Sequence, residues 1–283
     1  LEDEPICKPE EFKKIQEEYK GNITEIVRIA KNSNIEIILS NVVGNYEGWE
    51  PNRSIHKAGL SGEKLRRWRY HFFRGSDFLK EKKLEYAISE FKEAKKIDDS
   101  FAELNFLMAR AYEEAGSFQE AKKEYINAVD NDGDPKIAPT LFRNAILETC
   151  QNYKIPCMDV INAFERVSEK SLIGYNIMVD AHHPNMLGEL LIAKEIIRIM
   201  VDHNLIVPSQ QWSFENDRSD DWYLNKPDLT PEDEILYNQN RGLWFLKLST
   251  RRYDPKDRLQ RARLHFEKAY EIDPNSFRTY IGF

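Results

Sequence analysis

AISEFKEA (Ala87–Ala94) and AKKEYINA (Ala121–Ala128) are the two segments that decide the fold of the central part of this chain. Every alanine and aromatic residue of the first segment recurs 34 positions later in the second. Alanine, an aromatic residue and alanine at positions i, i+4 and i+7 share one face of a helix. Small residues let two helices approach closely, while aromatic rings fill the space between helix pairs. The pattern therefore predicts two successive helical hairpins.

The same period extends to neighbouring positions, since Phe78 recurs as Tyr112 and Gly75 as Ala109. A 34-residue period of small and aromatic residues resembles the tetratricopeptide repeat. Near the C-terminus, Ala262, Phe266, Ala269 and Pro274 repeat the order, and Ser276–Phe283 is expected to begin a further helix. This resemblance implies a protein partner bound by the repeats.

Two apolar runs flank the first pair of repeats. Ile35–Val43 (IEIILSNVV) and Ile155–Ile161 (IPCMDVI) are rich in β-branched residues and nearly continuous in apolar character. Such runs predict strands buried on both faces of a parallel sheet. With helices expected at Pro9–Ser33 and Thr140–Tyr153, the chain outside the repeats is predicted to be α/β.

The segment DAHHP (Asp180–Pro184) places a carboxylate three residues before a histidine, ahead of an amphipathic helix. A carboxylate that fixes one imidazole nitrogen prepares the ring to act as a general base. The alternative interpretation is structural: Asp180 caps a turn, and His182 and His183 are exposed loop residues.

Asp180 and His183, with Asn185 and Gly188, resemble the last block of the SGNH, or GDSL-type, hydrolases, in which a DxxH motif supplies two members of a Ser-His-Asp triad. Residues 37–61 are similar to a bacterial subgroup that carries tetratricopeptide repeats inside and after the catalytic domain. The matching positions are Asn45, Trp49, Pro51, Asn52, Arg53, Ser54 and His56. The implied fold is a partial flavodoxin-like α/β parallel sheet, interrupted by one repeat pair and followed by further helical repeats.

The resemblance implies a serine-dependent ester hydrolase or an acyl- or acetyl-transfer enzyme. In that reading His183 is the catalytic base and Asp180 orients it. Substrate-binding roles fall to Asn45, Trp49, Asn52 and Arg53. The implied substrate is an ester, such as an acetylated glycan or a lipid, and neither a metal nor another cofactor is implied. The alternative function is a non-catalytic interaction scaffold built from the repeats.

One block of the hydrolase pattern is missing. The family carries its nucleophile in a GDS-like block after the first strand, whereas Gly75-Ser76-Asp77 has these residue types in another order and inside a repeat. Without a serine a triad loses nearly all its rate. Because the chain begins at Leu1 and ends within an expected helix, we expect a segment of a longer protein with its serine upstream. Natural loss of the serine is the other explanation.

These patterns divide the chain into four parts. Residues 1–66 and 135–207 are expected to form the two segments of the hydrolase domain, with the DxxH motif in the second. Residues 67–134 form the inserted repeats, and residues 208–283 form a linker and C-terminal repeats.

Composition limits the classes of partner and site. The net charge of −7 and the lack of an evident basic stripe argue against nucleic acid. Cys7, Cys150 and Cys157 show neither a disulfide framework nor metal-ligand spacing, and the last two are expected to be buried thiols. A metal held by the His182–His183 pair would need ligands that the sequence does not show. No apolar run reaches the length of a membrane span, and the compartment stays open because a signal or anchor could lie upstream.

Overall fold

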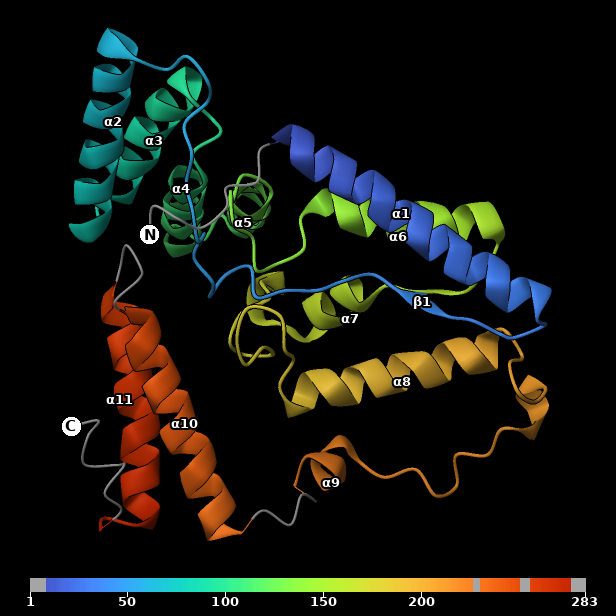
Figure 1. The fold of residues 1–283 in the computed structure, drawn as a ribbon. Helices are drawn as coiled ribbons and strands as arrows, with labels where there is room; N and C mark the ends of the chain where they lie inside the picture. The colour runs from blue at the N-terminus through green and yellow to red at the C-terminus, as the bar shows by residue number, and fades with distance from the viewer. Residues whose placement is uncertain (1–8, 226–229, 250–254, 276–283) are drawn as a thin grey trace. The chain divides into compact units, whose positions relative to one another are not determined.

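The computed structural model describes residues 9–225, 230–249 and 255–275, and it is mostly helical. The chain forms two compact units that divide between Asp217 and Arg218 (Figure 1). Neither this division nor any other feature tests the four domain boundaries expected from the sequence, which stay predictions. No helix in the three described ranges has both the length and the apolar character needed to cross a membrane.

The first unit contains a pair of helices from distant parts of the sequence, α1 (Pro9–Asn32) and α6 (Thr140–Tyr153). The two lie side by side (Figure 1). The rings of Tyr19 and Phe142 meet edge to face, with centroids 5.3 Å apart, and Val27 is fully buried. Both helices have the ranges expected from their apolar periodicity, apart from one residue at the end of α1.

The repeat segment folds as two successive hairpins (Figure 1), formed by α2 (Gly62–Lys80), α3 (Leu84–Ile97), α4 (Ala102–Glu114) and α5 (Phe118–Asp130). The periodic residues are buried in both hairpins, as the spacing predicted: Ala87, Phe91, Ala94, Ala121, Tyr125 and Ala128. A side chain added at Gly75 would lie 2.6 Å from the ring of Phe91. Glycine at this position therefore sets how closely α2 and α3 approach.

A short parallel sheet joins β1 (Leu39–Ser40) to β2 (Cys157–Met158), with Leu39 opposite Cys157. Beyond the strands, the side chain of Asn41 donates to Asp159 Oδ1 at 2.8 Å and accepts from the amide of Val160. Two helices follow β2, α7 (Val160–Val167) and α8 (Met186–Asp202), with a short 3-10 turn (Glu169–Ser171) between them.

The expected α/β flavodoxin-like fold is wrong. The structure is 65% helix and 3% strand, and within the described ranges its sheet has only two strands. One reason is local: the side chain of Asp159 accepts from the amide of Asn162 and so begins α7 inside the predicted strand 155–161. A second reason is burial, because Ile35 is 61% exposed at the start of the other predicted strand. Short apolar runs do not distinguish strand from helix by periodicity alone.

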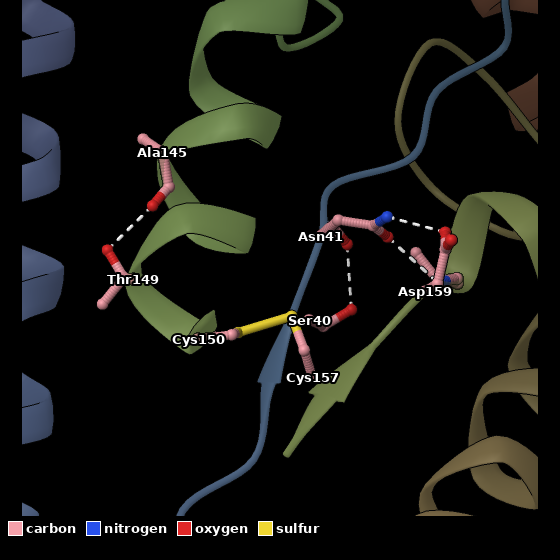
Figure 2. The surroundings of a disulfide bond; sticks show 8 residues. Ser40, Asn41, Ala145, Thr149, Cys150, Cys157 and Asp159 are labelled. Carbon is pink, nitrogen blue, oxygen red and sulfur yellow. Dashed lines mark hydrogen bonds between the residues drawn. A yellow bond between two sulfur atoms is a disulfide. The ribbon is translucent and has the colours of Figure 1, made fainter. Parts of the chain in front are cut away.

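A disulfide links Cys150 at the end of α6 to Cys157 in β2 (Figure 2). The expectation of two buried free thiols is therefore wrong for this pair, while Cys7 lies outside the described residues. The seven-residue separation spans the turn between α6 and β2. In this turn Lys154 adopts a left-handed conformation with φ of 49°. The disulfide holds α6 and β2 together. Thr149, one residue before Cys150, donates its hydroxyl to the carbonyl of Ala145 within α6.

The second unit consists of α9 (Asp220–Leu224), α10 (Pro231–Ser249) and α11 (Pro255–Ile272), and α10 packs along α11. Ala262, Phe266 and Ala269 are buried in α11, as the repeat spacing predicted. A side chain at Gly242 would lie 2.8 Å from the ring of Phe266. The unit thus uses the same glycine-to-phenylalanine contact as the first hairpin. The helix expected at Ser276–Phe283 lies outside the described residues.

Candidate functional site

The turn that carries Asp180 and His183 is held by several hydrogen bonds. Asp180 Oδ1 accepts from the backbone amides of His182 at 3.0 Å and His183 at 2.9 Å. The amide of Val179 donates to the carbonyl of His183 at 2.8 Å. Asn185 then caps α8 by accepting from the amide of Gly188. Asp180 therefore does cap the turn, as the structural interpretation predicted.

The same carboxylate also contacts the imidazole ring. His183 Nδ1 lies 2.8 Å from Asp180 Oδ2, and the side chains are 66% and 15% exposed respectively. Burial raises the pKa of Asp180, but hydrogen bonds from the His182 amide and from the ring and amide of His183 outweigh it and hold this pKa below its ordinary value. A charged carboxylate on Nδ1 leaves Nε2 as the nitrogen that can accept a proton.

Asp180, His182 and His183 also offer one possible metal-ligand atom each, and these atoms lie within 4.8 Å of one another. However, all three residues come from one turn, and both histidines are exposed. The Asp180 carboxylate already accepts from two amides and one ring nitrogen. A zinc site needs three or four protein ligands with free lone pairs. The group therefore reaches only the lower of these two numbers, and its acid is already engaged by hydrogen bonds.

Of the residues expected to bind substrate, Asn45 is the one that the structure brings to this turn. The backbone amide of Asn45 donates to the carbonyl of Ala181 at 2.9 Å. The side chain is fully buried and its Oδ1 accepts from the amide of Gly48 at 2.8 Å. Trp49 is only 6% exposed. Both side chains thus pack the 44–56 loop.

Asn52 and Arg53 connect the 44–56 loop to the residues that follow α5. Their backbone amides donate to the carboxylate of Asp132 at 2.7 and 2.8 Å, and the Asn52 side chain donates to the carbonyl of Asp134. Asp132 lies just after α5 and is 5% exposed. These two residues therefore join the loop to the end of the second hairpin, rather than to the turn at 180–184.

A second histidine–aspartate pair was not predicted from the sequence. His56 Nδ1 lies 2.8 Å from the carboxylate of Asp98, which is fully buried at the end of α3. The histidine ring stacks on Phe101 and meets Trp68 edge to face, with centroids 4.5 Å away in both cases. Because 42 residues separate His56 from Asp98, no local spacing in the sequence indicates this contact. The contact ties the loop to the first hairpin.

A basic and aromatic surface on α2 was also missed, and the expectation of no basic stripe is wrong. The side chains of Tyr70 and Phe73 are 55% and 60% exposed. Together with Arg66 they occupy positions i, i+4 and i+7, opposite the buried Trp68. The exposed residues Arg67, Arg69 and Arg74 flank them. We call these six residues the α2 face. The helical spacing of Arg66, Tyr70 and Phe73 is the sequence signal that indicates it.

Two pockets in the first unit each have a cavity volume of about 10 Å³. One of them is lined by Tyr46, Lys122, Arg143 and Glu165, among others. Burial raises the pKa of the Tyr46 hydroxyl to about 12, so it stays protonated. Small-molecule sites are usually about 300–1,000 Å³. Both pockets lie below that range.

Comparison with known protein families identifies a tetratricopeptide repeat at residues 102–135, which spans α4, α5 and the turn that follows. Neither the curated proteins nor the solved structures contain a match. The repeat expected from the 34-residue spacing is thereby confirmed in this segment. Nothing in the comparisons supports an SGNH hydrolase domain.

Proposed function

We propose that this chain is an interaction scaffold whose α2 face binds an acidic, apolar segment of a partner protein. The tetratricopeptide repeat supports a protein partner. The exposure of Tyr70 and Phe73 on one helical stripe is the observation that carries the proposal. Aromatic residues and arginine are the types enriched at the centres of protein interfaces.

Charge indicates the kind of partner. The chain as a whole has a net charge of −7, yet among the ionisable residues of α2 only Glu63 and Asp77 are acidic, against Lys64, Arg66, Arg67, Arg69, Arg74 and Lys80. In the described part of the chain, no hydrogen bond or ion pair engages the side chain of Arg66 or Arg69. Arg74, in contrast, pairs with Glu90 at 3.3 Å and lies over the ring of Tyr70. The guanidinium groups of Arg66 and Arg69 are therefore available to pair with carboxylates of a partner.

The test is fluorescence anisotropy with a synthetic amphipathic peptide that carries leucine and phenylalanine on one face and glutamate on the other. Removing a well-packed aromatic anchor or reversing an interface charge costs about tenfold or more in Kd. We expect that loss for Phe73→Ala and for Arg66→Glu combined with Arg69→Glu. Tyr86→Ala is the matched control, because Tyr86 is 64% exposed on α3 and lies outside the α2 face.

Equal binding by Phe73→Ala and the parent protein would contradict the proposal. So would equal binding of a peptide in which lysine replaces glutamate, because a partner chosen by charge must discriminate between the two.

A second candidate is acid–base catalysis on an ester by His183, with Asp180 as the orienting residue. It is favoured by the 2.8 Å contact between His183 Nδ1 and Asp180 and by the exposure of the histidine. The imidazole would remove a proton from the attacking hydroxyl or water, and the carboxylate would stabilise the resulting imidazolium. Asn45, which bonds to Ala181, would support the same turn.

Hydrolysis of an aryl acetate tests this candidate. General-base catalysis contributes about 10²–10⁴-fold, so we expect His183→Ala to lower kcat/KM by at least about 10²-fold. His182→Ala is the control, because His182 donates to Asp180 through its backbone amide, which the substitution keeps, while its ring lies next to that of His183. The same rate in His183→Ala and His182→Ala would remove His183 from the reaction.

A further inference from the structure

Two adjacent imidazole rings lie beside the carboxylate of Asp180. The ring centroids of His182 and His183 are 4.1 Å apart, and the ring planes are inclined by 46°. The two rings and the carboxylate each offer one possible ligand atom, and these three atoms lie within 4.8 Å of one another. Nowhere else in the described ranges do three histidine, cysteine, aspartate or glutamate side chains meet that distance. The structure thus adds a third possible ligand to the histidine pair.

The turn holds the carboxylate of Asp180 in place. Its Oδ1 accepts from the backbone amides of His182 and His183, at 3.0 and 2.9 Å, and its Oδ2 contacts Nδ1 of His183 at 2.8 Å. A carboxylate oxygen has two lone pairs, so Oδ2 keeps one beyond this contact. An antiparallel bridge between Met178 and Pro184 fixes the backbone on either side. The hydrogen bonds on Oδ1 therefore orient the carboxylate and leave Oδ2 for a ligand role.

The distances suit a single bound ion. Zinc binds nitrogen and oxygen at about 2.0–2.2 Å, so two ligand atoms on one ion lie about 3–3.5 Å apart. Nδ1 of His183 and Oδ2 of Asp180 are already 2.8 Å apart. An ion would take the place of the proton between them, and that proton would move to Nε2 of the same ring. The ring of His182 is exposed and, in the described part of the chain, holds no hydrogen bond, so it can turn to supply the third atom.

The types of ligand select the class of metal. Imidazole nitrogen suits zinc, copper and nickel, whereas magnesium and calcium prefer a shell made of oxygen atoms. Two histidines and one carboxylate are also the protein ligands of one kind of catalytic zinc site, which keeps a further position open to water. The exposure of both histidines leaves room for that water.

From this cluster we propose that Asp180, His182 and His183 bind one Zn²⁺ or a similar divalent transition-metal ion, with water in the remaining positions. The site is independent of the α2 face. It also differs from the acid–base pair of the second candidate function, because an ion on Nδ1 separates the ring of His183 from Asp180. His182, which has no role in that reaction, is a ligand here.

Isothermal titration calorimetry of the intact, chelator-treated chain with Zn²⁺ tests the site. We expect one ion per chain. Loss of a residue that only supports a metal ligand costs about 10–100-fold in affinity, so loss of a ligand should raise the Kd by about 100-fold or more. We expect this for His182→Ala, His183→Ala and Asp180→Asn. Asparagine keeps an oxygen that can accept from the two amides, and an unchanged circular dichroism spectrum would show that the turn persists.

Two other histidines serve as controls. His203 is exposed and follows Asp202, and His71 Nδ1 lies 2.6 Å from Glu90, but neither has a third ligand within reach. His203→Ala should keep the Kd of the parent for Zn²⁺, and Mg²⁺ should not bind. In NMR spectra, paramagnetic Cu²⁺ should broaden the imidazole signals of His182 and His183 before that of His71.

Three results would overturn the proposal: no saturable Zn²⁺ binding with a Kd below about 1 mM, the same Kd in His182→Ala and the parent, or one ion per two chains. The last result would mean that two copies share the ligands. Phe73→Ala should leave Zn²⁺ binding unchanged. Because His182→Ala should lose the metal but keep any ester hydrolysis, this site and both proposed functions can fail separately.

Discussion

Single carboxylates carry much of the connection between the 44–56 loop and the repeats. Asp132 and Glu50 are 5% and 6% exposed, and Glu103 in the first turn of α4 donates its amide to Ser54 Oγ at 2.8 Å. Burial raises the pKa of the Glu103 carboxyl to about 7, and the negative charge of Glu50 adds to the effect. Burial also raises the pKa of Asp132, against three backbone amides that lower it. The junction is therefore sensitive to pH near neutrality.

Replacing Glu103 with Gln should remove part of that sensitivity. The folded chain keeps a proton on Glu103 that the unfolded chain releases near pH 4.5, so the free energy of unfolding falls as pH rises from about 4.5 through 7. At about pH 8.5 we expect E103Q to be more stable than the parent by on the order of 2 kcal/mol, and at about pH 4 to differ little. Urea unfolding at both pH values measures this.

Glu63→Gln is the control for that experiment, because Glu63 is exposed in the first turn of α2. A stability gain of E103Q that is the same at both pH values would show that the raised pKa is not its cause.

At the scale of elements, glycine spacing controls how hairpins close. In a helix interior, replacing glycine with alanine usually stabilises by about 0.5–1 kcal/mol. At Gly75 the added carbon would meet the Phe91 ring, whereas at Gly21 in α1 nothing lies within 4 Å. We expect Gly75→Ala to destabilise by about 1–3 kcal/mol and Gly21→Ala to stabilise slightly. Thermal unfolding of the two variants measures the opposite signs, and a stabilised Gly75→Ala would contradict the packing described here.

The elements also show what the sequence could predict. The repeats were predictable because their contacts recur at helical spacing, so Ala87, Phe91 and Ala94 mark their own buried face. The strands were not, because Asp159 starts a helix within the apolar run by capping it. Cys150 and Cys157 gave no sign of pairing, since only the turn at Lys154 brings them together.

The candidate site divides in the same way. Asp180 and His183 are three residues apart, so one turn positions both, and their contact could be anticipated. Asn52 and Arg53 instead bond to Asp132, about 80 residues away, and nothing in the local pattern indicates that partner. The α2 face could be predicted by projecting residues 66–74 onto a helix. The negative net charge of the whole chain does not indicate this local basic surface.

At the scale of the whole molecule, the two units should respond differently to acid. His265 in the second unit contacts Asn238, with Nδ1 and Oδ1 2.9 Å apart. Burial, followed by the positive charges of Arg241, Lys268 and Arg261, lowers its pKa from 6.5 to about 4. The unfolded chain therefore binds a proton first as pH falls, and the second unit loses stability between about pH 6.5 and 4.

Calorimetry of the intact chain at about pH 7 and 4.5 measures this effect. Because the ring is only half-buried, we expect a loss on the order of 1–2 kcal/mol, confined to one transition. His265→Gln should abolish that loss, and His203→Gln, at an exposed position in the first unit, should not. An equal acid response in the parent and His265→Gln would show that another group controls the transition.

The pairing of β1 with β2 has a consequence for synthesis of the chain on the ribosome. Asn41 and Asp159, which join the ends of the two strands, are 118 residues apart, and both repeat hairpins lie between them. Helical hairpins form from local contacts and fold quickly, so they can form before β2 exists. At about 5–20 residues per second, β1 waits roughly 6 to 24 seconds for its partner. During that interval the isoleucines beside β1 are exposed on a nascent chain, where a chaperone could bind them.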